Sequence, residues 1–105
     1  MTSKAAKLVR DRIPEIVRAN GKSCTITQLS AAEYRQALRE KLVEEANEVA
    51  DAEEKSELLK ELADVGEVLN ALMAAYNISP EQVKSIQQER REQRGGFEQG
   101  WMLHL

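Results

Sequence analysis

Two acidic stretches decide the fold expected of this chain: EEANE at residues 44–48 and ELAD at residues 61–64. Each holds two carboxylates three residues apart, and residues with this spacing lie on one face of an α-helix. The two pairs are Glu45 with Glu48, and Glu61 with Asp64. The polar segment 51–56 between them can turn the chain back. The simplest geometry is therefore an antiparallel helical hairpin on which four carboxylates converge.

The position of Glu45 on its helix indicates a metal site. Glu45 falls on a stripe that is otherwise apolar, with Leu38, Leu42 and Val49. A half-buried carboxylate without a partner is costly, and a bound cation would remove that cost. Convergent carboxylates suit Mg²⁺, with Mn²⁺ as the alternative, and Mg²⁺ commonly also holds substrate phosphates. The competing interpretation is that these acids form an ordinary solvated face.

Length and composition limit the classes of protein. The chain has 105 residues, which fits one small domain over residues 1–105, and a chain this short gains from oligomerisation. Its net charge of −3 gives no support to binding a nucleic-acid polymer. Cys24 is the single cysteine, so no intramolecular disulfide can form. With no signal-like start and no apolar run longer than residues 71–76, we expect a soluble cytoplasmic protein without membrane attachment.

Local signals predict four helices. Pro14 suits the first turn of a short helix that Asp11 caps and that ends at residues 20–21, Asn-Gly. Two capping boxes are expected, because Glu33 follows Ser30 by three residues and Gln82 follows Ser79 by three residues. Ser56 is a third candidate N-cap. The three longer helices are expected at roughly residues 31–52, 57–76 and 80–93.

The second helix of the hairpin is expected to bury a stripe that runs from Leu58 to Tyr76. Its other members are Leu62, Val65, Leu69 and Leu72. The last helix offers only Val83 and Ile86 and should be the most exposed. The β-branched segment Cys24–Leu29 and the alternating carboxyl-terminal tail suggest, in addition, a short two-stranded pairing.

Four stretches taken in order resemble one family. They are KLVRDRIP at residues 7–14, EEANE at 44–48, ELADV at 61–65 and RGGF at 94–97. Together they are similar to the MazG-like, or phosphoribosyl-ATP pyrophosphohydrolase-like, branch of the all-α NTP pyrophosphatases. The resemblance implies an all-α fold with a helical hairpin core, assembled as a homodimer or homotetramer. It also implies Mg²⁺-dependent hydrolysis of a nucleoside triphosphate to the monophosphate and pyrophosphate, as house-cleaning of non-canonical nucleotides.

The resemblance also assigns roles to residues. Glu45, Glu48, Glu61 and Asp64 match the metal-binding carboxylates. Glu44 is the other acid of the motif, and either Glu44 or Glu48 is expected to activate the attacking water. Arg10 and Arg12, with Lys7, match the basic opening, and Arg94 matches a basic residue before paired glycines; the three arginines are candidate phosphate contacts. Gly66 departs from the family pattern, where a large apolar residue is usual.

Two other functions stay open at this point. The first is phosphoribosyl-ATP hydrolysis in histidine synthesis, which would use the same acids on a different substrate. The second is a helical interaction module without catalytic activity, in which the acids form a surface for solvent or a partner.

Overall fold

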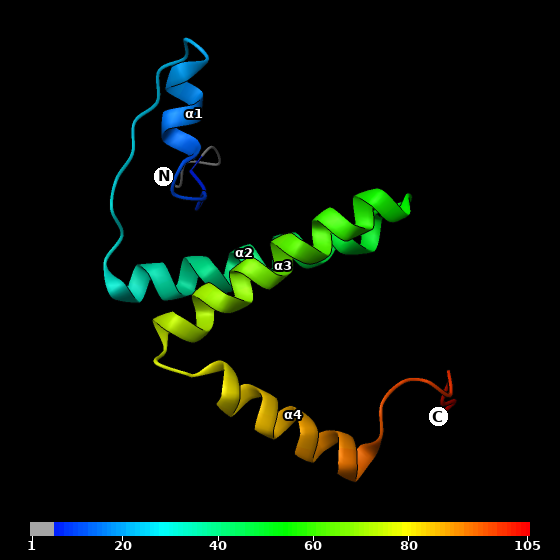
Figure 1. Ribbon diagram of the computed structural model, residues 1–105. Helices are drawn as coiled ribbons and strands as arrows, with labels where there is room; N and C mark the ends of the chain where they lie inside the picture. The colour runs from blue at the N-terminus through cyan, green and yellow to red at the C-terminus, as the bar shows by residue number, and fades with distance from the viewer. Residues whose placement is uncertain (1–5) are drawn as a thin grey trace.

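The computed structural model describes residues 6–105, and over that range it contains four helices and no strand (Figure 1). The all-α fold expected from the sequence is confirmed. None of the helices in the described part is long and apolar enough to cross a membrane. In chain order the helices are α1 (Ile13–Ala19), α2 (Ala31–Asp51), α3 (Lys55–Ala75) and α4 (Pro80–Arg94).

The packed part of the molecule is the antiparallel pair of α2 and α3. Leu38 on α2 and Val68 on α3 are its buried apolar side chains, and Glu45 is buried with them. The expected apolar stripe of α3 is only partly correct: Leu58, Val65 and Leu72 are half-buried, whereas the three other members are exposed. The exposed members are Leu62, Leu69 and Tyr76. Two helices bury only the faces that they turn to each other, so the flank of a wide stripe stays uncovered.

Capping boxes begin α2 and α4, as the sequence predicts. The backbone N–H of Glu33 donates to Ser30 Oγ at 3.2 Å, and the N–H of Ser30 donates to Glu33 Oε1 at 3.0 Å. Ser79 and Gln82 repeat this arrangement at 3.1 and 2.7 Å. Each box satisfies backbone donors that have no partner inside the helix, and so fixes where the helix starts.

The caps predicted for α1 and α3 are wrong. Helix α3 begins at Lys55 with Glu54 as its N-cap, and Ser56 lies inside the first turn. The side chain of Glu57 accepts a hydrogen bond from the backbone N–H of Glu53 at 3.1 Å. This bond ties the residue before the N-cap to the first turn of α3. At α1 the N-cap is Arg12 rather than Asp11, and no side chain bonds to the cap position.

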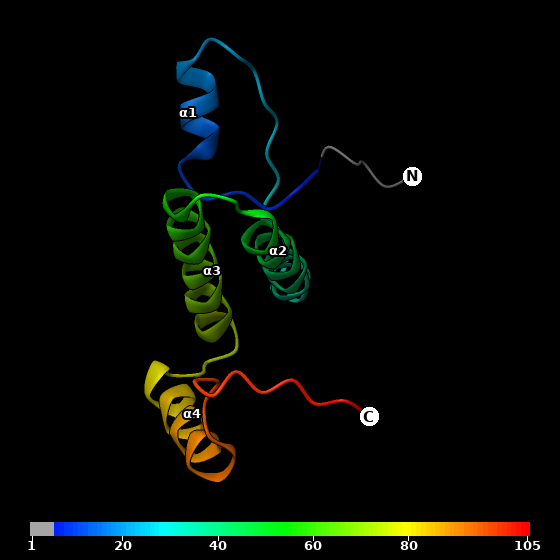
Figure 2. The same cartoon turned by 90° about the vertical axis from the view of Figure 1, so that its right-hand side faces the viewer.

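The suggested pairing of Cys24–Leu29 with the carboxyl-terminal tail is also wrong, because neither segment forms a strand. Cys24–Leu29 leads into the end of the hairpin where α2 begins, and α4, which precedes the tail, leaves from the same end, where α3 finishes. From that end, α1 with its connecting segment extends to one side of the hairpin, and α4 with the tail extends to the other (Figures 1 and 2). The two segments are thus kept apart.

Candidate metal and phosphate site

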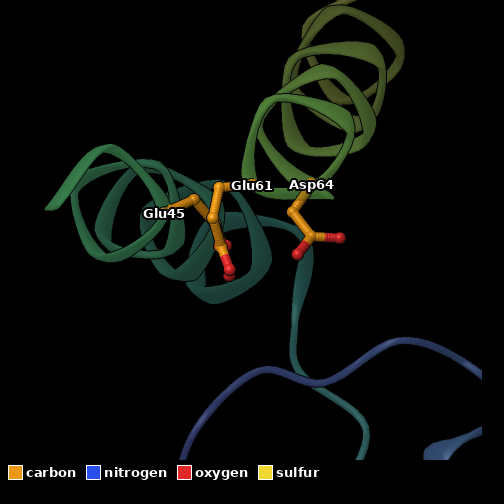
Figure 3. A group of neighbouring side chains, drawn as sticks. All are labelled: Glu45, Glu61 and Asp64. Carbon is orange, nitrogen blue, oxygen red and sulfur yellow. The ribbon is translucent and has the colours of Figure 1, made fainter. Parts of the chain in front are cut away.

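Three carboxylates from the two hairpin helices meet at one place. Oxygens of Glu45 on α2 and of Glu61 and Asp64 on α3 all lie within 4.8 Å of one another. Figure 3 shows the three side chains directed to the same side of the hairpin. The three-residue spacing puts Glu61 and Asp64 on one face of α3, and the packing of α2 against that face adds Glu45.

Two oxygens of this cluster are buried and have no hydrogen-bond partner among the described residues: Oε2 of Glu45 and Oε2 of Glu61. Among residues 6–105, the cation at ion-pair distance from Glu45 is Lys41, whose Nζ lies 3.5 Å from Oε1. A buried polar atom without a partner is uncommon because its desolvation is not compensated. A divalent cation with oxygen ligands would satisfy these atoms, so the residues present fit such an ion.

Glu48 borders the cluster from the exposed side of α2. Its pKa is raised, first by the neighbouring Glu61 carboxyl and then by burial and the charge of Glu44, while the Glu45 carboxyl opposes the rise. The pKa of Glu45 is raised too, by burial first and then by the neighbouring Glu48 carboxylate. The free carboxylates therefore repel one another, and either a proton or a cation relieves the repulsion.

The basic opening of the chain passes next to the acids (Figure 3, blue). Arg10 Nη2 lies 2.6 Å from Asp64 Oδ1, and Lys7 Nζ lies 3.2 Å from Glu44 Oε1. The hydrogen bond from Lys7 is the main reason that the pKa of Glu44 lies below its usual value. The Lys7–Glu44 contact joins residues 37 positions apart in the sequence, and the Arg10–Asp64 contact joins residues 54 positions apart. Both contacts hold the basic opening beside the acids.

Arg12 and Arg94, the other two predicted phosphate contacts, are not brought to the acids within the chain. Arg12 pairs with Glu15 of its own helix, with Nη2 and Oε1 3.0 Å apart. Arg94 is the last residue of α4, which runs away from the hairpin on the side opposite α1. Asp64 lies about 16 Å along α3 from the point where α4 departs, at 1.5 Å per residue.

Sequence reasoning missed two features. Lys41 pairs with both Glu44 and Glu45 at 3.5 Å, and its i, i+3 and i, i+4 spacing to them was the available signal. Tyr76, a member of the expected apolar stripe of α3, accepts a hydrogen bond from Arg39 Nε at 2.8 Å. The guanidinium of Arg35 lies over the same ring. This group of Arg35, Arg39 and Tyr76 lies at the end of the hairpin remote from the acids. It joins α2 to α3, and a contact between two helices leaves no spacing pattern in the sequence by which it could have been predicted.

Comparison with known proteins adds a family match. The family model described as phosphoribosyl-ATP pyrophosphohydrolase matches residues 6–91. An uncharacterized protein of Mycolicibacterium smegmatis is 47% identical over 55 residues, which cover 52% of this chain. The match spans 56% of that protein, a little over half of its length. No solved structure matches the chain.

Proposed function

This chain belongs to the phosphoribosyl-ATP pyrophosphohydrolase family, and we propose that it is a Mg²⁺-dependent pyrophosphohydrolase. It would cleave a nucleoside triphosphate to the monophosphate and pyrophosphate, with non-canonical nucleotides as the substrates. The observation that carries the proposal is the meeting of Glu45, Glu61 and Asp64 with two buried oxygens left without partners. A cytoplasmic location and assembly as a homodimer or homotetramer stay predictions from the sequence.

Glu45, Glu61 and Asp64 would hold the cation, with Glu48 at the rim as a further ligand or as the base. When bound, Mg²⁺ or Mn²⁺ would offset the charge between carboxylates and substrate phosphates and act as a Lewis acid on the anhydride. Lys41, already paired with Glu45, favours the ionised form of that carboxyl and so partly opposes the rise in its pKa.

Of the two candidate bases, Glu48 is the better suited. Glu44 is already engaged by Lys7 and Lys41, which lower its affinity for a proton. Glu48 is exposed and its pKa is raised, so it can accept a proton more readily near neutral pH. In the proposed step Glu48 takes the proton of a water whose oxygen bonds to phosphorus, while the bond between the first and second phosphates breaks and pyrophosphate leaves.

In this proposal Arg10 would bind a substrate phosphate, which its ion pair with Asp64 supports. Its guanidinium is more than half exposed while paired with Asp64, so it can exchange a carboxylate for a phosphate oxygen. The exchange would free Asp64 for the metal and place a positive charge on the transferring or leaving phosphate. Lys7, whose side chain is similarly exposed, can make the same exchange from Glu44.

Phosphoribosyl-ATP is the second candidate substrate, because the matching family model carries that description. The test is pyrophosphate release from canonical and damaged nucleoside triphosphates and from phosphoribosyl-ATP, each with Mg²⁺ and with EDTA. We expect metal-dependent release from at least one member, and preference for phosphoribosyl-ATP would assign the histidine pathway. A folded protein that releases no pyrophosphate from any of them would leave the interaction module as the better explanation.

A further inference from the structure

Lys41 is the most deeply placed of the three basic side chains that pair with acids of the hairpin near the cluster. Its side chain is 20% exposed, against 59% for Lys7 and 57% for Arg10. An exposed cation can leave one carboxylate for another partner at little cost, because solvent replaces the lost contact. The mostly buried Lys41 is instead held in one position by the packing around its stem.

The geometry of α2 directs Lys41 to Glu45. Lys41 precedes Glu44 by three residues and Glu45 by four, so the three side chains are neighbours on the helix surface. Helical side chains lean toward the amino terminus, which turns the Glu45 carboxyl back toward the turn that carries Lys41. Lys41 Nζ lies 3.5 Å from Oε1 of each carboxylate. One oxygen of Glu45 is therefore engaged from within its own helix.

The two oxygens of Glu45 have different surroundings. Oε1 pairs with Lys41, whereas Oε2 is buried and has no hydrogen-bond partner within residues 6–105. The Glu45 side chain is only 9% exposed, so solvent does not satisfy this oxygen. A buried oxygen without a partner, beside the carboxylates of Glu61 and Asp64, points to a cation (Figure 3). Glu45 presents one free oxygen to that cation.

The number of oxygens that a carboxylate offers separates Mg²⁺ from Ca²⁺. Mg²⁺ takes about six ligands in near-octahedral geometry and keeps several waters, so single carboxylate oxygens suit it. Ca²⁺ is larger, takes about six to eight oxygens and readily accepts both oxygens of one carboxylate. Glu45, Glu61 and Asp64 each bring one oxygen to the cluster. A second oxygen from Glu45 would favour Ca²⁺.

We propose that Lys41 is a positioning residue that selects the cation, because it holds Oε1 of Glu45 and leaves Oε2 as the single oxygen for the metal. The site then discriminates against Ca²⁺ more strongly than the same site without Lys41. Arg10 holds Oδ1 of Asp64 at 2.6 Å, but that pair is exposed and exchanges more easily. This inference rests on the cation site of the function proposed above, and not on which nucleotide is cleaved.

Lys41→Met tests the proposal, because it removes the ammonium and keeps an unbranched side chain of similar length. The Kd values of Mg²⁺ and Ca²⁺ can be measured by displacement of Mn²⁺, whose free ion gives an electron paramagnetic resonance signal. Loss of a positive charge strengthens the binding of any cation, and loss of orientation weakens it, so the ratio of the two Kd values is the readout. We expect the Kd of Ca²⁺ divided by that of Mg²⁺ to fall about tenfold.

Lys7→Met is the matched control. It removes one positive charge beside Glu44 and leaves the pair of Lys41 with Glu45 intact, so both Kd values should change by the same factor. An unchanged ratio in Lys41→Met, or an equal fall in Lys7→Met, would show that charge alone matters and would overturn the proposal. Lys41→Gln, whose side chain is shorter and neutral, replaces Lys41→Met if circular dichroism shows that the latter does not fold.

Infrared difference spectra test the number of oxygens directly. The splitting between the antisymmetric and symmetric carboxylate stretches narrows when both oxygens bind one cation. In the spectra induced by Ca²⁺, this splitting should be narrower in Lys41→Met than in the wild type. Identical spectra would overturn the proposal even if the ratio of Kd values changes.

The same measurements separate this proposal from the proposed function. A folded wild type that binds neither Mg²⁺ nor Ca²⁺ refutes both. A wild type that binds Mg²⁺ but releases no pyrophosphate refutes only the function, and the ratio of Kd values still decides the role of Lys41.

Discussion

The hairpin and α4 are both helical, but different interactions hold them in place. In the hairpin, α2 and α3 pack against each other, and this packing brings acids from two helices within 4.8 Å of one another. Helix α4 has no buried residue, and its start depends on a capping box and on Pro80 at its first turn. A helix of 15 residues is marginal in water without packing. The position of the acids therefore depends on tertiary packing, whereas the start of α4 depends on local capping.

The largest expected effect is the loss of the cluster. Glu45→Ala should lower kcat by about 1,000-fold or more, because the cation would lose its buried ligand. The helical circular dichroism should remain, since the change also removes a buried oxygen without a partner. Glu67→Ala, which changes an exposed acid on the neighbouring helix α3, is the control and should leave turnover unchanged. Wild-type turnover in Glu45→Ala would show that the metal assignment is wrong.

The next effect is stabilisation by metal, which should depend on pH. The raised pKa values of Glu45 and Glu48 mean that the folded state binds protons more tightly than the unfolded state. Their contribution to stability is therefore present at acidic pH and is lost as pH rises through the folded-state values. Magnesium should replace those protons and stabilise by about 2.7 kcal/mol at 100 times its Kd.

Thermal unfolding with Mg²⁺ and with EDTA measures this effect. The shift in Tm should be larger at pH 8 than at pH 5, because protons compete with the cation at the lower pH. Glu45→Gln should reduce the shift. Equal shifts at both pH values would mean that the cation binds elsewhere.

The two capping boxes test the contrast between the hairpin and α4. Ser30→Ala should lower the free energy of unfolding by about 1 kcal/mol, because α2 unfolds with the hairpin. Ser79→Ala removes the same bond from α4, which hardly packs on the rest of its chain, so in a monomer it should raise amide exchange in α4 with little change in the global transition. Denaturant unfolding and hydrogen exchange measure the two quantities, and equal global losses would mean that α4 folds as one unit with the hairpin.

The smallest effect concerns Gly66, around which no atom lies within 4 Å of an added Cβ. In a single copy, Gly66→Ala should stabilise α3 by up to about 1 kcal/mol, since glycine is a poor helix former. If this part of α3 is covered in an assembly, the same change should weaken association instead. Tm measured across a range of protein concentrations distinguishes the two results.

The sequence by itself determined the helices and much of the acidic site. Capping boxes at Ser30 and Ser79, the glycine after α1 and the paired acids depend on spacings of three or four residues, which a helix fixes by its own geometry. For the same reason the convergence of Glu45, Glu61 and Asp64 could be expected once two adjacent helices were inferred.

The tertiary structure alone decided which basic residues meet those acids and which apolar residues stay exposed. Arg10 reaches Asp64 while Arg12, two residues later, turns to Glu15, and nothing in their spacing distinguishes them. Leu62 and Leu69 share the stripe of Val65 and Leu72 yet are exposed, because a two-helix hairpin covers only one face of α3. Contacts between residues more than 30 positions apart depend on the path of the chain between them. The spacing of residues within one helix does not determine that path, so these contacts could not be predicted from the sequence.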